Sequence, residues 1–198
     1  MNRSNDVARD TDVLAALRTA TASRHERLDS GLPLSALLPS LDDYAAHLRM
    51  VRDWLAPLER WMGGFADGPQ AEPTLPATSR LALIQSDLAE PGMPEVQPLG
   101  PAAAWPLQAS AAWRWGVAYV IEGSQLGGAV LYGKLAGALA PHPLRYLRGE
   151  EGGPGPRWRA FMLALRARVS SPAEIAEACA GACAAFDAIL ALAPLGKN

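Results

Sequence analysis

The stretch "YVIEGSQLGG", from Tyr119 to Gly128, lies inside a long apolar run that is otherwise typical of a buried helix. Gly123, Gly127 and Gly128 fall close together within this expected helix. A glycine in a helix interior costs about 1 kcal/mol relative to alanine. Two interpretations account for that cost: a neighbouring helix packs closely against the small residues, or a flat ligand lies against nearly bare backbone. Glycines also allow a helix to bend, so we expect a kink here.

The rest of the chain has the pattern of an all-α protein. Ser40 and Ser171 are expected N-caps, and no window shows the alternation of a β-strand. The expected helices cover 11–29, 40–62, 78–88, 113–139, 157–169 and 172–192. Pro57 should kink or interrupt the second of them. We predict a single helical domain over 11–192, between a flexible tail at 1–10 and a C-terminal tail at 193–198.

Composition excludes several classes of function. The formal net charge of −2 argues against general nucleic-acid affinity, which needs a basic field. The two cysteines, Cys179 and Cys183, are framed by alanines and are interpreted as small buried residues rather than a disulfide or a metal pair. The amino-terminal stretch lacks the apolar core of a signal peptide, and no uncharged run is long enough to span a bilayer. We therefore expect a cytoplasmic protein with no membrane or nucleic-acid partner, and a monomer.

His25 lies on the apolar stripe of the first expected helix, together with Leu14, Leu17, Thr21 and Leu28. One interpretation is a core histidine bonded to a neighbour. Asp29, one turn later, favours a second interpretation, in which His25 is a metal ligand. A carboxylate there can fix the imidazole tautomer and leave the second nitrogen free for a metal. Arg18 lies two turns earlier, about 10 Å along the axis. That separation suits a flat ligand with a metal at its centre and carboxylates at its edge, such as an iron porphyrin.

The other two histidines have weaker patterns. His47 lies among apolar residues of the second helix, and we interpret it as a residue of helix packing. His142 lies in "PHP", where the chain turns, and we interpret it as part of a solvated loop.

The stretch "LRTATASRHERLD" (Leu17 to Asp29), taken together with "YVIEGSQLGG", resembles the heme oxygenase family. The resemblance is strongest to the bacterial biliverdin-producing branch, which includes enzymes encoded beside bacteriophytochromes, and it extends over about 11–192. It implies an all-α, single-domain heme-oxygenase-like bundle. In that fold, heme lies between the first helix and a kinked, glycine-rich distal helix.

The resemblance also implies roles for individual residues. His25 corresponds to the proximal iron ligand, and Asp29 to the carboxylate one turn further on. Gly123, Gly127 and Gly128 correspond to the distal glycines. Ser124 stands where the mammalian branch has a distal aspartate, and bacterial members share "EGS" here.

Three residues are candidates for binding the heme propionates. Arg18 matches the basic residue seven positions before the histidine, and Tyr119 the aromatic residue that opens the glycine motif. Some bacterial relatives use a lysine near Lys134 to hold the propionates of a rotated heme. Tyr119 and Lys134 are about 20 Å apart along a straight helix, so they should not bind the same propionate. We predict the seating on Arg18 and Tyr119, and hence cleavage at the α-meso carbon.

The implied reaction is the opening of heme b to biliverdin, Fe²⁺ and CO, with O₂ and electrons from an external donor of the ferredoxin or reductase type. Heme is both substrate and cofactor, and family analogy suggests a bacteriophytochrome as biliverdin acceptor. One alternative is a heme-binding protein without turnover, used for storage, transfer or sensing, which the missing aspartate favours. Another is a related helical fold for a different ligand, such as a thiamin-degrading type, which would need an activated cysteine or paired carboxylates.

The later helices carry a group of arginines with two possible roles. Four arginines, Arg157, Arg159, Arg166 and Arg168, form either a docking face for an acidic electron donor or an ordinary solvated face, and the latter is preferred.

Overall fold

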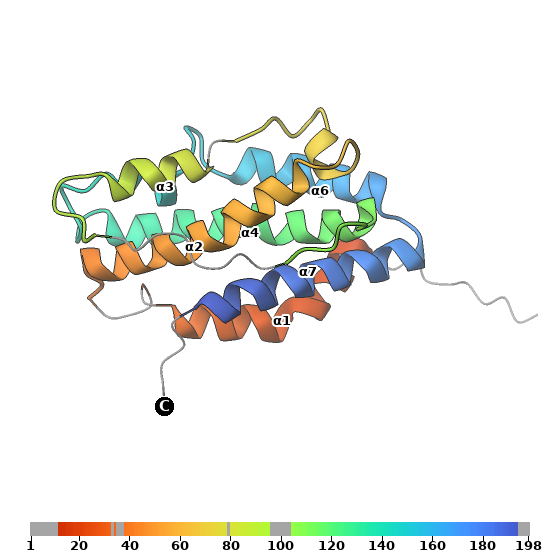
Figure 1. Cartoon of the computed structure of the whole chain (residues 1–198), viewed down its shortest axis with the longest axis horizontal. Helices are drawn as coiled ribbons and strands as arrows, with labels where there is room; N and C mark the ends of the chain where they lie inside the picture. Colours follow the sequence, from red (N-terminus) through yellow and green to blue (C-terminus); the bar gives the residue numbers. More distant parts are fainter. Residues whose placement is uncertain (1–11, 33, 35–37, 79, 96–103, 194–198) are drawn as a thin grey trace, which may run out of the picture.

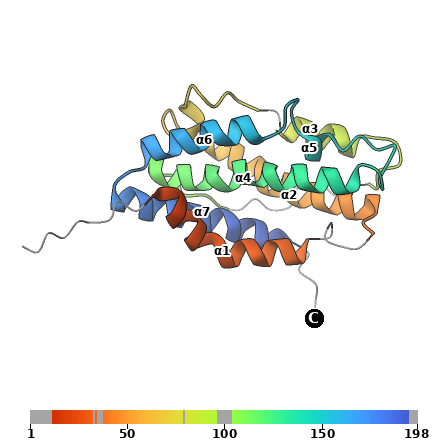
Figure 2. The same cartoon turned by 180° about the vertical axis from the view of Figure 1, so that it is seen from behind.

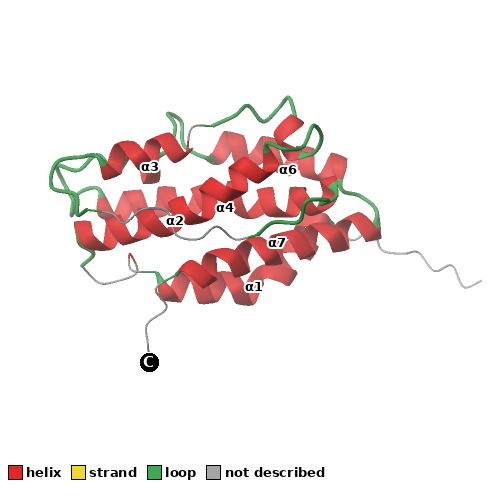
Figure 3. Ribbon diagram, viewed as in Figure 1, coloured by secondary structure: helices red, strands yellow, loops and turns green. Residues whose placement is uncertain are grey.

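The computed structural model describes residues 12–193, apart from 33, 35–37, 79 and 96–103. Its helices are α1 (Val13–Gly31), α2 (Leu41–Met62), the 3₁₀ turn η2 (Pro69–Ala71), α3 (Arg80–Leu88), α4 (Ala111–Leu135), α5 (Arg145–Arg148), α6 (Gly155–Arg168) and α7 (Pro172–Leu192). The described part contains no strand (Figure 3). The all-α prediction is therefore confirmed, while the two predicted tails lie outside the described residues apart from Ala193.

The helices form a bundle around α4. In Figures 1 and 2, α1 and α7 run side by side along one edge, and α3, α5 and α6 lie on the opposite side. Helix α4 runs between these two groups and packs most extensively on α7. Helix α2 contacts both α3 and α7. The amino-terminal helix and the glycine-rich helix are thus parts of one bundle, as the sequence pattern predicted.

Capping boxes fix the start of two helices. At the start of α2, the Ser40 hydroxyl accepts from the Asp43 backbone N–H at 3.2 Å, and the Asp43 carboxylate accepts from the Ser40 N–H at 2.8 Å. Ser171 and Glu174 make the same reciprocal pair at the start of α7. Each pair satisfies two backbone donors that the first helical turn leaves unpaired. These signals explain why both starts lie within one residue of the predicted positions.

Pro57 does not interrupt α2, which continues to Met62. Of the two predicted outcomes, the interruption is wrong, because the face of α2 around Pro57 is buried in the core, and the kink stays a prediction. Trp54, Leu55 and Leu58 are all at most 1% exposed. Burial of such side chains contributes about 1.5–3 kcal/mol each, which together exceeds the roughly 3 kcal/mol that a helical proline costs.

Close packing of α4 on α7 depends on two glycines. A Cβ atom built at Gly116 would overlap the backbone carbonyl of Ala178, and one built at Gly181 would overlap that of Trp113. Three alanines of α7, Ala178, Ala182 and Ala185, are fully buried. In this half of α4, glycine is required by helix packing.

Helix α7 is long and apolar enough, by length and composition, to cross a membrane, which the sequence analysis did not predict. The prediction considered only uncharged runs, whereas α7 carries charged residues, including Asp187, which pairs with Arg24 at 2.8 Å. In the structure, α7 packs along both α1 and α4. The core helix of a water-soluble bundle has the same length and composition.

Candidate functional site

A cavity of about 600 Å³ lies between the first helix and the glycine-rich half of α4. His25 and Asp29 line one wall, and Gly123, Gly127 and Gly128 line another. A wider hollow of about 710 Å³ shares His25, Asp29 and Tyr119 with it and reaches Arg18. These volumes are those of sites for small molecules and cofactors. The structure therefore brings the two sequence motifs, almost a hundred residues apart, to the same cavity.

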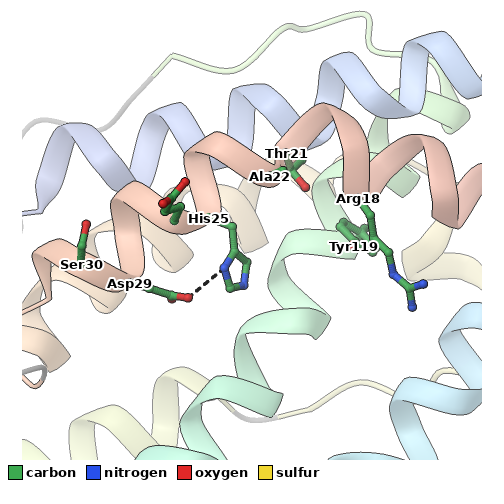
Figure 4. Close-up of a pocket in the computed structure, with 8 residues that line it drawn as sticks. Arg18, Thr21, Ala22, His25, Asp29, Ser30 and Tyr119 are labelled. Atoms are coloured by element: carbon green, nitrogen blue, oxygen red, sulfur yellow. Dashed lines mark ion pairs between the residues drawn. The ribbon is translucent and has the colours of Figure 1, made fainter.

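His25 carries the metal-binding chemistry of this cavity. Its Nδ1 lies 2.9 Å from an Asp29 carboxylate oxygen, one helical turn away. Figure 4 shows the ring extending from α1 toward α4, with the Asp29 pair at its side. The carboxylate favours the tautomer with its proton on Nδ1, which leaves the Nε2 lone pair available to a metal.

Of the two interpretations of His25, the core histidine does not hold. Its side chain is 63% exposed, although Leu17 and Thr21 on the same stripe are buried. Leu28, further along the same stripe, packs against the core again, so the exposure is local to His25, which lines the cavity. The nearest ring is that of Phe186, whose centroid is 5.9 Å away.

The glycines that line the cavity are not required by helix packing. A Cβ atom at Gly127 would meet nothing within 4 Å. One at Gly123 would come no nearer than 3.8 Å to Trp158, and one at Gly128 no nearer than 3.8 Å to Leu147, which are ordinary contacts. Of the two sequence interpretations, close helix contact holds at Gly116 and fails at these three positions. Helix α4 is continuous through them, and the kink stays a prediction.

Ser124 lines the cavity with its hydroxyl already committed. The Oγ donates to the Ile121 carbonyl at 2.7 Å and lies 3.2 Å from the amide nitrogen of Gln125. The same amide nitrogen is 3.3 Å from the Tyr146 hydroxyl, and Tyr146 also lines the cavity. Burial raises the pKa of Tyr146, so its hydroxyl is neutral. Ser124, Gln125 and Tyr146 thus form a set of three neutral polar groups, of which Ser124 and Tyr146 line the cavity.

Cationic residues lie at two separate ends of the site. Arg18 lines the outer hollow beside Tyr119, and Figure 4 shows the two side chains next to each other. Burial raises the pKa of Tyr119, and the charge and hydrogen bond of Arg18 offset part of that increase. Lys134 is exposed and lines the cavity of about 600 Å³ that the glycines also line. Tyr119 and Lys134 both line the 600 Å³ cavity, whereas Arg18 lines only the wider hollow, and the choice between the two propionate seatings stays a prediction.

A buried ion cluster holds α4 beside the glycines. The Glu122 carboxylate accepts from two nitrogens of Arg157 at 2.8 and 2.9 Å, and Arg80 lies 2.8 Å away as an ion pair without hydrogen-bond geometry. Burial alone would raise the pKa of Glu122, but the two guanidinium groups outweigh it and lower that pKa. The pairing of Glu122 with Arg80 and Arg157 was not predicted from the sequence. A lone carboxylate in a buried helix was the signal that could have revealed it.

The second helix supplies a buried floor. His47, Met50, Val51 and Trp54 of α2 all line the cavity and are at most 7% exposed. Phe186 and other core side chains complete this surface. The interpretation of His47 as a packing residue is therefore incomplete, because the ring is buried and also faces the cavity.

His142 is a buried residue, so its placement in a solvated loop is wrong. Its Nδ1 accepts from the Leu144 backbone N–H at 3.1 Å, and its Nε2 lies 3.1 Å from the Asp87 carbonyl. The Asp87 carboxylate is fully buried and accepts from the Tyr44 hydroxyl at 2.6 Å and the Tyr146 N–H at 2.8 Å. This network fixes the loop before α5, and so the position of Tyr146 at the cavity.

The remaining candidate residues lie away from the cavity. Among the residues described, both cysteines are free and neither lines the cavity, which argues against a cysteine-dependent activity there. Three of the four later arginines form ion pairs: Arg157 with Glu122, Arg166 with Asp12, and Arg168 with Glu72. Arg157 thus belongs to the buried Glu122 cluster rather than to a surface face, and the pairs of Arg166 and Arg168 favour the solvated-face interpretation for those two arginines.

The chain is similar to known proteins in sequence and in fold. No family model matches the chain. Over 110 residues the chain is 41% identical to a protein named heme oxygenase from Xanthomonas campestris pv. campestris (strain 8004), an alignment that covers 54% of this chain and 62% of the relative. The fold is similar to that of the NO- and CO-bound heme oxygenase from Neisseria meningitidis, with a TM-score of 0.68, 23% identity, and 91% and 89% of the two chains covered.

These comparisons do not distinguish the bacteriophytochrome-associated branch, which stays a prediction. The all-α architecture predicted from the pattern of the chain is confirmed and matches the fold of a heme oxygenase, and the chain resembles the heme oxygenase family in sequence as well as in fold.

Proposed function

We propose that this chain is a heme oxygenase, which uses O₂ and electrons from a ferredoxin or reductase to convert heme to biliverdin, Fe²⁺ and CO. One observation carries the proposal. A histidine with a carboxylate partner faces, across one cavity, a helix wall on which glycines have no packing role. The heme oxygenase named in the sequence comparison, and the one solved with NO and CO bound, support the same conclusion.

The residues present fit heme. The cavity has room for a flat macrocycle because side chains are missing at Gly123, Gly127 and Gly128. His25 presents an imidazole nitrogen, an axial ligand that iron porphyrins commonly take. Arg18 and Lys134 are exposed cations at the rim, where propionate charges remain near water. Heme, when bound, supplies both the iron that activates O₂ and the carbon skeleton that is oxidised.

The protein's own part is to bind, orient and exclude water. Asp29 holds the His25 tautomer, and the ion cluster of Glu122 holds the distal wall in place. Arg18 and Tyr119 bind the propionates in the seating that directs oxidation to the α-meso carbon. Ser124 and Tyr146 supply neutral hydroxyl groups on the distal side, where ordered water can bring protons.

The remaining parts of the proposal concern the setting. The protein acts in the cytoplasm as a monomer, and a bacteriophytochrome is a suitable acceptor for its biliverdin. These elements follow from family analogy.

The test is turnover of purified protein loaded with heme. Addition of ferredoxin, its reductase, NADPH and O₂ should replace the Soret absorption by that of biliverdin, and CO should be released. His25→Ala should abolish the reaction, because the iron loses its protein ligand. A wild-type Soret band that persists under these conditions would instead indicate a heme-binding protein without turnover.

A further inference from the structure

His47 is the one polar residue of the buried floor that α2 contributes to the cavity. It is 7% exposed, and its Nδ1 is fully enclosed without a hydrogen-bond partner among the described residues. The two other buried polar residues of the cavity are different. Thr21 donates to the Leu17 carbonyl at 2.8 Å, and the Tyr146 hydroxyl contacts Gln125 at 3.3 Å. Of these three buried residues, only His47 has an enclosed polar atom without a hydrogen-bond partner.

The ring presents a hydrogen-bond donor to the cavity. Burial lowers the pKa of His47 to about 4, so the imidazole is neutral at neutral pH and carries a single N–H. An enclosed N–H without an acceptor is less tolerable than an enclosed lone pair. The favoured tautomer therefore has its lone pair on the enclosed Nδ1 and its proton on Nε2, the nitrogen left to face the cavity.

The acceptor for this donor has to be neutral. Propionates are charged and belong at the rim, beside Arg18 or Lys134, because an anion at the floor would be far from water and from any cation. The α-meso carbon lies on the edge of the macrocycle opposite the propionates. In the proposed seating on Arg18 and Tyr119, that edge is directed away from the hollow that Arg18 lines and into the cavity that the α2 floor closes, where heme offers only carbon and hydrogen.

Oxidation changes this edge. Cleavage at the α-meso carbon leaves two lactam oxygens, one on each side of the opened bond, and both are neutral acceptors. We propose that His47 is a recognition site for the oxygenated tetrapyrrole, in which its ring N–H donates to a lactam oxygen of biliverdin. The inference rests on the proposed function for the identity of the ligand, and it assigns a new role to a residue of the second helix.

The consequence is a difference in affinity between product and substrate. Heme leaves the donor without an acceptor, whereas biliverdin IXα satisfies it. A buried polar group left unpaired opposes binding, and the same group paired favours it. His47 should therefore strengthen the binding of biliverdin relative to heme, and slow the release of product.

The experiment compares the dissociation constants of biliverdin IXα and heme in titrations of the full chain. His47→Phe keeps the volume of the ring and removes the donor, and His47→Gln restores a donor. Met50→Leu, on the same floor, is the matched control. We expect His47→Phe to weaken biliverdin IXα on the order of tenfold, with heme affinity unchanged or higher. His47→Gln should recover most of the loss, and Met50→Leu should bind both ligands as wild type does.

Equal weakening of both ligands in His47→Phe, or no change in either, would overturn the inference. The affinity for biliverdin IXδ, whose lactam oxygens lie at another edge, should not change on the substitution.

If His47→Phe fails to fold, ¹⁵N NMR of the wild-type imidazole decides the point, because biliverdin should shift the Nε2–H proton downfield and metal-free protoporphyrin should not. An unshifted proton contradicts the proposal. Absence of wild-type turnover would count against the proposed function alone, since the binding ratio is measured without catalysis.

Discussion

The three histidines occupy three environments that give them different chemistry. His25 is exposed to the cavity and paired with a carboxylate, which suits a metal ligand. His142 is buried, and both of its nitrogens have backbone partners, so it is structural. His47 is buried without a partner for Nδ1 and lines the cavity. The identity of the residue is the same in each case, and the neighbouring acceptors decide what it can do.

The stability of the protein should depend on pH through His47. Its pKa is lowered from 6.5 to about 4 in the folded chain, so between these values the unfolded chain binds the extra proton. Stability is therefore lost as the pH falls through this window, by about 3 kcal/mol in total. His47→Phe should lose less stability than wild type between pH 7 and pH 4, as measured by urea unfolding. Met50→Leu, which does not titrate, should follow the wild-type curve, and parallel curves for all three proteins would contradict the assignment.

The two propionate candidates predict different products. Arg18 lies beside Tyr119 in the wider hollow, and Lys134 lines the cavity that the glycines line. Propionates bound at Arg18 and propionates bound at Lys134 therefore require different seatings of the macrocycle. If Arg18 and Tyr119 hold the propionates, Arg18→Gln should lower heme affinity on the order of tenfold and reduce the fraction of biliverdin IXα. Lys134→Gln should leave the isomer unchanged. Chromatography of the products checks both, and a change of isomer in Lys134→Gln alone would favour the rotated seating.

At the scale of elements, α4 divides into two halves with different reasons for glycine. Gly116, in the first half, lies against the backbone of α7, so no side chain fits. Gly127, in the second half, faces the cavity with nothing within 4 Å of a Cβ atom. Sequence alone could not separate these reasons, because both positions lie in the same apolar pattern. The separation depends on what each position faces, the backbone of α7 at Gly116 and the cavity at Gly127, which is a tertiary property.

Substitution of these two glycines should therefore have opposite effects on stability. Gly116→Ala forces a Cβ into the Ala178 carbonyl and should destabilise the protein by about 3 kcal/mol or more. Gly127→Ala meets no atom and should stabilise α4 by up to about 1 kcal/mol through helix propensity. Thermal and urea unfolding measure both. Similar losses in the two variants would show that Gly127 also has a packing role.

The same helix gives a functional contrast. Gly127→Leu should fold as wild type does, since the side chain enters open space, but it should narrow the cavity beside the ligand. We expect a fall of at least tenfold in biliverdin formation while heme still binds through His25. The assay is single-turnover absorbance with the reductase system. Unchanged turnover in this variant would contradict the assignment of the glycine wall to the distal side.

The element boundaries show which signals in the sequence are decisive. Ser40 and Ser171 fixed two helix starts because capping is a local interaction between residues three apart. The interruption predicted at Pro57 does not occur, because burial of the neighbouring side chains outweighs the local cost of a proline in a helix. Helix α5 was not predicted, because its four residues show no periodic pattern. Its backbone N–H groups at Arg145 and Tyr146 donate to the distant Asp87 carboxylate.

At the scale of the whole molecule, the site could be predicted where its chemistry is local and not where it is assembled. The His25–Asp29 pair and the glycine run are each readable within one helix, and their meeting at one cavity followed from the family resemblance. The floor residue His47 and the Glu122 cluster bring together α2, α3, α4 and α6, so no spacing in the sequence reveals them. Long-range partners of this kind appear only in the folded chain.

The cavity should make the stability of the whole molecule depend on its ligand. A ligand that binds only the folded chain stabilises it by about 2.7 kcal/mol at a hundred times its dissociation constant. For a domain of this size that corresponds to a rise in Tm of about 5–10 °C, measurable by scanning calorimetry with and without heme. The rise should be smaller for His25→Ala at equal heme concentration, because the iron has lost its ligand, and metal-free protoporphyrin should not distinguish that variant from wild type. An equal rise for both proteins with heme would mean that the iron is held by a group other than His25, and the sandwich between α1 and α4 would then have to be abandoned.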